Sequence, residues 1–287
     1  MKNLVCLLLA AAGIAGAKSP FAFRAVSRDS LELSENGRAV FVYNHGMMLP
    51  PGVPEQFRRS TYVHPVFAPD GTLLSDDFPK DHYHHRGIFW AWRVVKHGGE
   101  THDLWTIEGV HQRFVRWIAR DAATRSARLA VENGWFMGDR KIVKEIVEIV
   151  TGPASGGRRD LDFTLRFEAL QGPVEISGSP DRGYSGFGFR FAPRQNTVIE
   201  TERGVEKEDS NLAPHPWAQL TATFQGRRAG ARIGIGRDNP GYPNGWCLRH
   251  YGYLGVDFPG HDTFTLAPGH PLTLRYRVTL FAESGGR

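Results

Sequence analysis

Apolar and polar residues alternate one for one in several stretches of this 287-residue chain. The clearest runs are LDFTLRF at 161–167 and LTLRYRVTL at 272–280. Side chains of a β-strand point to opposite faces in turn, so a period of two predicts strands with one buried face. Shorter runs with the same period lie at 21–26, 38–43, 128–131, 187–191, 220–224 and 231–235. The pattern predicts an all-β fold.

One segment, KIVKEIVEIV at 141–150, has an ambiguous spacing. Apolar residues at 142, 143, 146, 147 and 150 recur as they would on one face of a helix. Every apolar side chain in the segment is Ile or Val, however, and these β-branched residues lose rotamer freedom in helices and fit a pleated sheet. We therefore predict a long strand.

Glycine and proline interrupt the chain at intervals typical of strand connections, and the sequence holds 33 Gly and 18 Pro. No other segment has the pattern of an amphipathic helix longer than two or three turns. These features favour a large antiparallel β-sandwich. The segment GPASGGRRD at 152–160 resembles a linker but is short enough to be a hairpin loop, so we expect a single β-sandwich domain over 18–287.

The first residues have the pattern of a signal peptide. Lys2 is followed by an apolar run from Leu4 to Ala15, and the small residues at 15–17 fit a cleavage site. The run is shorter than the ~20 residues that a membrane-spanning helix needs. We predict a signal peptide at 1–17 and export to the periplasm or the medium, with no transmembrane segment after cleavage.

The chain has two cysteines, Cys6 and Cys247, so removal of the leader would leave one thiol and no internal disulfide. We expect Cys247 to pack as a small apolar residue. The formal net charge is +5, and basic residues occur in scattered pairs such as Arg58-Arg59 rather than in long runs. This distribution argues against a nucleic-acid partner.

Histidines are concentrated in one part of the chain. Seven of the twelve lie between residues 64 and 111, and three of these lie in the stretch DHYHHRG at 81–87. Imidazoles serve as proton carriers near neutral pH and as metal ligands. We predict a functional site at this cluster, with His82, His84 and His85 as catalytic residues. The alternative is that the imidazoles hydrogen-bond to backbone groups in an ordered loop, which we favour for His97, His102 and His111.

A metal site is a variant of this hypothesis. If the stretch is extended, His82 and His84 project to one side and His85 to the other, so the first two form half of a site for a divalent metal. A third ligand would have to come from His64, Asp103 or His250.

Arg86 and the aromatic residues that follow it suggest a binding surface. A guanidinium suits a carboxylate or sugar hydroxyls, although Arg86 could instead pair with Asp76, Asp77 or Asp81. Flat aromatic side chains suit the apolar face of a sugar ring, and we expect Trp105 to form a pocket wall and Trp90 and Trp92 to pack in the core. The stretches RRSTYVHPV and RHYGYLGVDFPG are expected to converge on the same site. They supply it with His64 and His250 as further catalytic histidines and with Arg59, Tyr62 and Tyr251 for substrate binding.

Asp103 and Glu108 are the carboxylates expected to act as acid, base or ligand. A glycosidase with paired carboxylates holds them about 5 to 10 Å apart across the scissile bond. A separation of five residues in the sequence does not determine the distance between Asp103 and Glu108. The sequence contains no Gly-rich phosphate loop, serine nucleophile elbow, zinc-protease helix or cysteine metal pattern.

At these residues the chain resembles a bacterial family labelled PmoA-like, or methane oxygenase PmoA. The phrases that carry the resemblance are YVHPVFAPDGTLLSDDFPKDHYHHRGIFWAW, DLWTIEG, ENGW and RHYGYLGV, and the resemblance covers most of the mature chain. The label implies a subunit of a membrane-bound methane oxygenase. The resemblance also implies an exported protein of carbohydrate-degrading bacteria with a β-sandwich similar to galactose mutarotase. In mutarotase-like enzymes a histidine and a carboxylate act as acid and base on a sugar ring.

The sequence therefore leads to three hypotheses on function. The first is an exported carbohydrate-active enzyme, a hydrolase, lyase or epimerase, whose ligand is a carbohydrate or another small polar molecule. The second is a non-catalytic carbohydrate-binding or surface-assembly protein. The third is a copper or iron oxygenase, as the histidines and the family label suggest.

Overall fold

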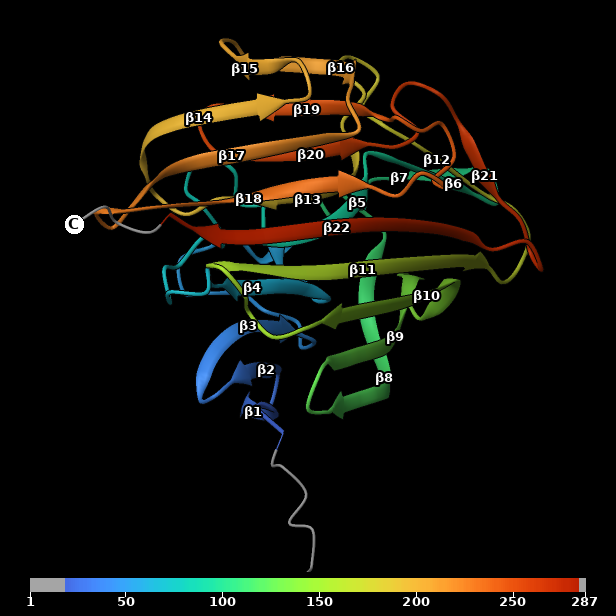
Figure 1. The fold of residues 1–287 in the computed structure, drawn as a ribbon. Helices are drawn as coiled ribbons and strands as arrows, with labels where there is room; N and C mark the ends of the chain where they lie inside the picture. The colour runs from blue at the N-terminus through green and yellow to red at the C-terminus, as the bar shows by residue number, and fades with distance from the viewer. Residues whose placement is uncertain (1–18, 284–287) are drawn as a thin grey trace, which may run out of the picture.

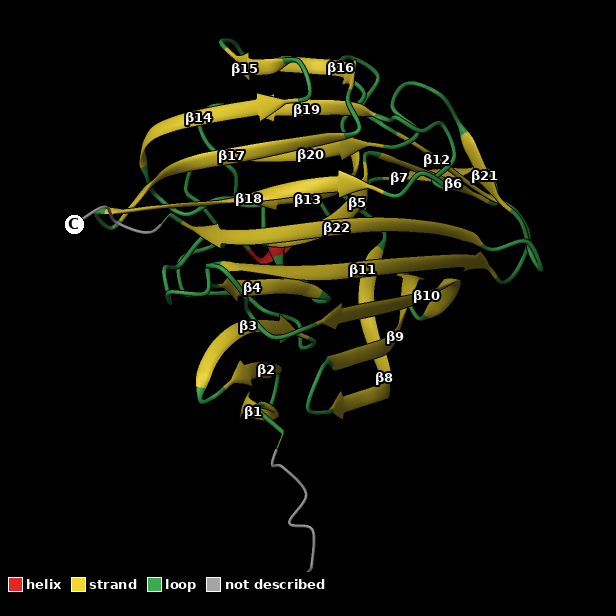
Figure 2. Cartoon of the chain, in the orientation of Figure 1, coloured by secondary structure: helices red, strands yellow, loops and turns green. Residues whose placement is uncertain are grey.

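The computed structural model of the protein describes residues 19–283, so the predicted signal peptide and Cys6 lie outside the described residues. The described part is almost entirely β-structure, with 22 strands in three sheets (Figures 1 and 2). All strand pairs are antiparallel, which confirms the predicted fold class. In residues 19–283 the only helix is the one-turn η1, Glu55–Phe57, and no helix there is long and apolar enough to cross a bilayer.

The first large sheet has nine strands and carries the candidate site. In spatial order its strands are β1 (Phe21–Ser27), β2 (Ser30–Glu35), β3 (Arg38–Asn44), β4 (Tyr62–Val66), β5 (Ile88–Trp92), β13 (Ser185–Arg190), β20 (Tyr253–Asp257), β19 (Gly245–Arg249) and β16 (Ser210–Pro214). Strands β1 to β5 follow the chain order, whereas the other four come from the C-terminal half.

The second large sheet also has nine strands, and a third sheet has four. The second consists of β15 (Gly204–Glu206), β14 (Gln195–Thr201), β17 (Trp217–Phe224), β18 (Arg227–Ile235), β22 (Leu272–Ala282), β11 (Arg158–Ala169), β10 (Arg140–Thr151), β9 (Ala127–Met137) and β8 (His111–Ala122). The third consists of β21 (Phe264–Leu266), β12 (Val174–Ser177), β6 (Val94–His97) and β7 (Glu100–His102) and lies at one end of the molecule (Figure 1).

The two large sheets pack face to face through aromatic side chains. Trp92 of β5 lies 5.2 Å from Trp135 of β9 between ring centroids, and Phe187 of β13 stacks on Tyr276 of β22 at 4.4 Å. Trp90 and Trp92 are fully buried, which confirms that they belong to the core. Aromatic rings bury large apolar areas, so these contacts form the centre of the sandwich.

The ambiguous segment at 141–150 forms strand β10, and a bulge explains its helix-like spacing. The register against β9 shifts between Lys141 and Val143, which leaves the consecutive residues Ile142 and Val143 both buried. Beyond the bulge, regular alternation buries Glu145, Val147 and Ile149. The 152–160 segment contributes the hairpin loop between β10 and β11.

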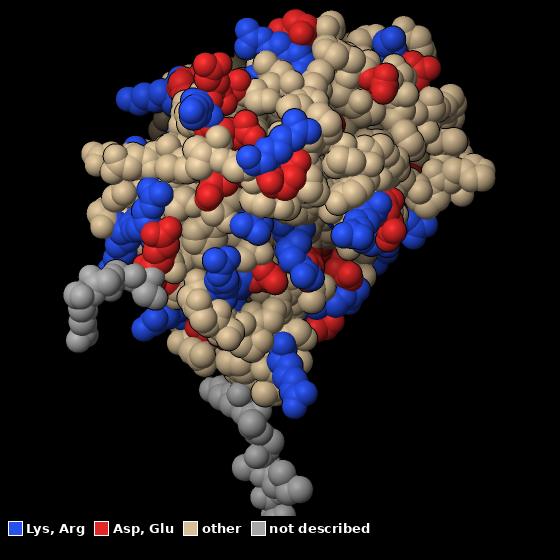
Figure 3. Space-filling model, turned by 45° about the horizontal axis from the view of Figure 1, so that its top comes forward, with Lys and Arg blue, Asp and Glu red and all other residues tan. Residues whose placement is uncertain are grey.

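Acidic and basic side chains are interspersed on the molecular face drawn in Figure 3. Elsewhere in the sheets, charged side chains pair across neighbouring strands, as Arg277 does with Asp162 and Arg128 with Glu148. Such mixed charge is typical of a solvated surface.

Candidate functional site

The histidine-rich stretch forms two consecutive turns at the entrance to β5. The amide of His82 donates to the carbonyl of Pro79, and the amide of His85 donates to the carbonyl of His82, each at 2.9 Å. Because the stretch is not extended, the expected strand alternation does not apply to it. His82, His84 and His85 all line one pocket.

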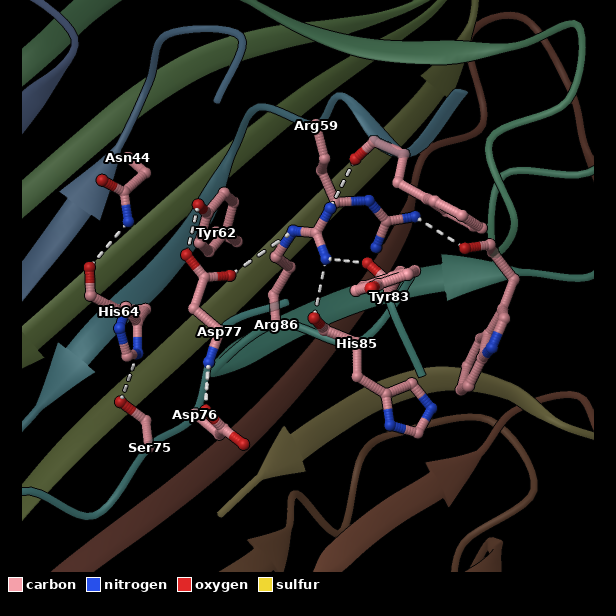
Figure 4. A network of polar contacts seen from close by, with 12 residues as sticks. Asn44, Arg59, Tyr62, His64, Ser75, Asp76, Asp77, Tyr83, His85 and Arg86 are labelled. Atoms are coloured by element: carbon pink, nitrogen blue, oxygen red, sulfur yellow. Dashed lines mark hydrogen bonds and ion pairs between the residues drawn. The ribbon is translucent and has the colours of Figure 1, made fainter. Parts of the chain in front are cut away.

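Arg86 holds this loop in place (Figure 4). Its side chain is fully buried, and its Nη1 donates to the carbonyls of Tyr83 at 2.5 Å and His85 at 2.7 Å. Its Nη2 donates to the carbonyl of Phe57, and its Nε lies 3.5 Å from Asp77 Oδ1. The structure therefore places Arg86 beneath the loop rather than in the pocket lining, where it satisfies main-chain carbonyls that the turns leave unpaired.

The pocket has a volume of about 350 Å³, within the range of small-molecule sites. It lies where the loops before β5 and β13 meet β19 and β20 of the first sheet. Its lining consists mainly of imidazoles, aromatic rings and arginines: His82, His84, His85, Arg93, Trp105, Asp181, Arg182, Tyr184, Cys247, Tyr251 and Tyr253.

Two of the pocket histidines belong to a column of stacked rings. His82 stacks on Tyr251, at 5.1 Å between centroids, and on His85, at 4.7 Å, and His85 in turn stacks on Tyr253 at 4.8 Å. The ring of His84 stands at 85° to that of His85. Burial is the main cause that lowers the pKa of His84 to about 3 and the pKa of His85 well below its ordinary value. Both rings are therefore neutral at neutral pH.

The floor of the pocket depends on two glycines. Tyr253 lies flat on its own sheet, and a Cβ at Gly188 would come 2.1 Å from its hydroxyl oxygen. A Cβ at Gly255 would come 2.6 Å from a ring carbon of Tyr253. Within residues 19–283, the Tyr253 hydroxyl and His85 Nδ1 are buried without a hydrogen-bond partner. Both polar atoms therefore lie at the pocket without a partner among the described side chains and backbone groups.

His82 is the pocket histidine with a carboxylate partner. Its Nδ1 lies 3.0 Å from Asp81 Oδ2, in a contact that is close but not linear. Arg190 Nη2 donates to both oxygens of Asp81 at 2.8 Å. Burial alone would raise the pKa of Asp81, but the hydrogen bonds from Arg190 and the close contact with His82 lower it below its ordinary value. An ionised carboxylate thus orients the imidazole, as in hydrolases that use a histidine base.

Asp103 holds Trp105 and Arg93 at the pocket wall. Its Oδ1 accepts hydrogen bonds from the amides of Trp105 at 2.7 Å and Thr106 at 2.9 Å. Its Oδ2 lies 3.1 Å from Arg93 Nε. Arg59 lies beneath this turn, where its Nη2 donates to the carbonyls of Leu104 and Trp105. Asp103 and Arg59 are therefore positioning residues in this structure.

Four other predicted site residues do not line the pocket. His64 Nδ1 contacts Ser75 Oγ at 2.8 Å, and the Tyr62 hydroxyl donates to Asp77 at 2.9 Å. Glu108 accepts from the Thr106 hydroxyl. His250 contacts Asp209 through Nδ1 at 2.9 Å and the carbonyl of Glu206 through Nε2 at 3.1 Å. Each of these side chains is satisfied by residues outside the pocket.

Sequence reasoning did not identify several residues that line or support the pocket: Asp81, Arg93, Asp181, Arg182, Tyr184, Arg190 and Tyr253. A signal was present for Tyr253, because it lies two residues after Tyr251 and is followed two residues later by Gly255. The arginines and Tyr184 gave no such signal. Cys247 is buried, as predicted, and burial raises the pKa of its thiol, which is therefore protonated at neutral pH.

The described residues do not fit a metal ion. In residues 19–283, no three His, Cys, Asp or Glu side chains are placed to hold one. The rings of His82 and His85 are nearly parallel, at 11°, so the nitrogen lone pairs, which lie in the ring planes, do not converge on one point. The proposed pair His82 and His84 gains no third ligand from His64, Asp103 or His250.

Comparison with known proteins gives a family without an assigned activity. Residues 30–285 match the model described as a family of unknown function, DUF6807. The chain belongs to this family. The DUF6807 match does not test the resemblance to PmoA-like proteins, which stays a prediction. Among curated proteins, no sequence matches this DUF6807 chain.

Solved structures with a similar course of the chain were also found for this DUF6807 member. A galactose mutarotase related enzyme from Lactobacillus acidophilus is 7% identical with a TM-score of 0.40, over 92% of this chain and 97% of that chain. A galactose mutarotase-like protein from Lactobacillus casei is 8% identical with a TM-score of 0.41, over 91% and 99%. A GalM/aldose epimerase homologue from C. elegans is 7% identical with a TM-score of 0.40, over 94% and 100%.

Proposed function

We propose that this protein is an exported enzyme that transfers a proton on a carbohydrate bound in the histidine pocket, with His82 as the acid or base. The observation that carries the proposal is the contact of His82 with the ionised Asp81 inside a pocket walled by aromatic rings. Export is supported by the leader pattern at 1–17.

Asp81 prepares His82 for proton transfer. Because Nδ1 faces the carboxylate, Nε2 is the nitrogen left to exchange a proton with a ligand. The positive charge that forms on the ring is stabilised by Asp81, and Arg190 holds Asp81 from the other side. The bent contact between His82 and Asp81 is expected to straighten when a ligand fills the pocket, since catalytic hydrogen bonds are often poorly aligned without substrate.

The other lining groups suit a sugar ring. Trp105 and Tyr184 face each other at 22° between ring planes, and Tyr251 covers His82. Such rings bind the apolar face of a sugar, while neutral imidazoles such as His84 and His85 donate and accept hydrogen bonds with its hydroxyls.

Among the three reaction classes, a lyase or epimerase fits the lining better than a hydrolase. Glycoside hydrolysis commonly uses two carboxylates on opposite sides of the scissile bond. Asp181 is the one carboxylate among the lining residues, and its side chain is 72% exposed. Asp103 and Glu108 are engaged with Arg93 and Thr106. A single histidine that exchanges protons suffices for removal of a proton from carbon.

Replacement of His82 by glutamine tests this proposal. With a panel of neutral and acidic monosaccharides and oligosaccharides, His82→Gln is expected to lower kcat by about 10² to 10⁴-fold, the usual contribution of a general acid or base. His250→Gln is a matched control because His250 also contacts an aspartate at 2.9 Å but lies outside the pocket. The control should retain parental kcat, and both variants should keep the parental melting temperature within a few degrees.

A non-catalytic carbohydrate-binding protein is the second candidate. It is favoured by the low pKa of His84, which makes that ring a weak base but a good hydrogen-bond partner. Sugar binding without product formation from any member of the panel would support this candidate and overturn the enzymatic proposal. Equal loss of activity in His82→Gln and His250→Gln would also contradict the role assigned to His82.

A further inference from the structure

Arg93 presents an unused guanidinium edge at the pocket. It lies between β5 and β6, and its Nε forms an ion pair with Asp103 Oδ2 at 3.1 Å without the geometry of a hydrogen bond. Within residues 19–283, its Nη nitrogens form no hydrogen bond either, and its side chain is 34% exposed. A guanidinium held at one edge with its other donors free has the planar fork geometry that binds a carboxylate or a sulfate through two hydrogen bonds.

Positive charge exceeds negative charge around the pocket. Asp181 lies 3.6 Å from Arg182 and Asp103 lies 3.1 Å from Arg93, so each of these pairs is offset and the excess comes from Arg59. Arg59, fully buried behind Trp105, contacts carbonyls and has no carboxylate within ion-pair distance in the described part of the chain. Burial, followed by the nearby charge of Arg86, lowers the pKa of Arg59 to about 9, so it remains charged at neutral pH.

The positive charge around the pocket also affects the pocket histidines. After burial and His82, the charges of Arg59, Arg86 and Arg93 are the causes that lower the pKa of His84. A positive field inside a poorly solvated pocket raises the affinity for an anion and disfavours a cation.

We infer that the sugar bound in this pocket carries an anionic group, a carboxylate or a sulfate, and that the free Nη nitrogens of Arg93 bind that group. The inference rests on the proposed function for the sugar itself. Trp105, which Asp103 fixes beside Arg93, stacks on the ring of the same ligand. Arg93 thus selects acidic sugars over neutral ones.

The test compares glucuronate, glucose 6-sulfate and glucose as ligands in calorimetry with the intact protein. We expect both anionic sugars to bind more tightly than glucose. Arg93→Gln should weaken glucuronate binding by about 10- to 100-fold, the contribution of a charged hydrogen bond, while glucose binding changes less than about two-fold. Arg93→Lys keeps the charge but not the two-pronged donor geometry, so its affinity for glucuronate should lie between those of the parent and Arg93→Gln. Comparison of glucuronate with glucose 6-sulfate identifies which anion is preferred.

Arg113→Gln is the matched control, because Arg113 has a similar exposure of 38% and also lies near a carboxylate, Asp139 at 3.6 Å, but on β8 outside the pocket. It should bind all three sugars as the parent does. Glucose binding as tight as glucuronate, or equal weakening of both in Arg93→Gln, would overturn the inference and leave the proposed function standing. If none of the three sugars binds, the inference and the proposed function both fail.

Discussion

Neighbouring histidines of this chain have different chemistry because their surroundings differ. His82 contacts a carboxylate, whereas the partly buried His84 and the fully buried His85 lie among other imidazoles and arginines that oppose a positive charge. His64 is partly buried near Arg86, and its pKa is lowered to about 4, mainly by burial. A sequence shows how many imidazoles are close in the chain but not how each is solvated, so it predicted one catalytic role for His82, His84 and His85.

His64 gives a prediction on pH-dependent stability. Its folded-state pKa of about 4 lies below the unfolded value near 6.5, so the unfolded chain binds its proton more readily. The stability linked to His64 is therefore fully present above pH 6.5 and is lost as the pH falls toward 4. As the pH falls from 6.5 toward 4, the unfolding free energy of His64→Gln should decrease less steeply than that of the parent, by up to about 1.4 kcal/mol per pH unit.

Urea unfolding at pH 5 and pH 7 measures this effect. His270→Gln changes a histidine exposed in the turn before β22 and serves as the control. An unchanged difference between the two pH values in His64→Gln would show that His64 does not contribute to the acid sensitivity.

At the scale of elements, the β-branched composition of the segment at 141–150 correctly predicted a strand. Its bulge and its buried glutamate could not be predicted, since both depend on the neighbouring strands. Glu145 points into the sandwich and accepts hydrogen bonds from Asn133 at 2.9 Å, Gln112 at 2.9 Å and Trp135 at 2.7 Å. Asn133 also donates to the hydroxyl of Tyr43, which belongs to the opposite sheet.

Replacement of Glu145 by alanine tests how much this hydrogen-bond network contributes to the stability of the fold. Three buried donors would lose their acceptor, and each unpaired group costs about 1–3 kcal/mol, so we expect Glu145→Ala to lower the unfolding free energy by about 3 kcal/mol or more. Glu148 lies on the same strand but faces outward and pairs with Arg128. Glu148→Ala should therefore cost less than about 1 kcal/mol in the same urea experiment. Similar losses in both variants would contradict the assigned network.

The turns at 81–87 show a second feature that the sequence did not predict, the role of Arg86. The density of polar groups correctly marked the segment as unusual, but Arg86 has a structural role there. Its guanidinium bonds to three carbonyls, a use that depends on the path of the loop and on the turn at Phe57. Residue type alone does not distinguish this use from ligand binding.

At the scale of the whole molecule, the pocket forms because distant segments become neighbours in one sheet. β5, β13, β20 and β19 are adjacent, which brings the 81–87 loop, the loop before β13 and Tyr251 together. Alternation predicted the strands and the sandwich, and the sequence predicted that some of these stretches would meet. Strand order is not encoded in any local pattern, so the lining residues of the loop before β13 were not identified.

Histidine-resolved NMR tests the central claim that a sugar binds at His82, His84 and His85. In a long-range ¹H–¹⁵N spectrum of the imidazole nitrogens, titration with glucuronate should shift the signals of these three residues. His215 and His250, which contact carboxylates outside the pocket, should stay unchanged. Shifts at His215 or His250 alone, or no shift at any of the three pocket histidines, would contradict the account.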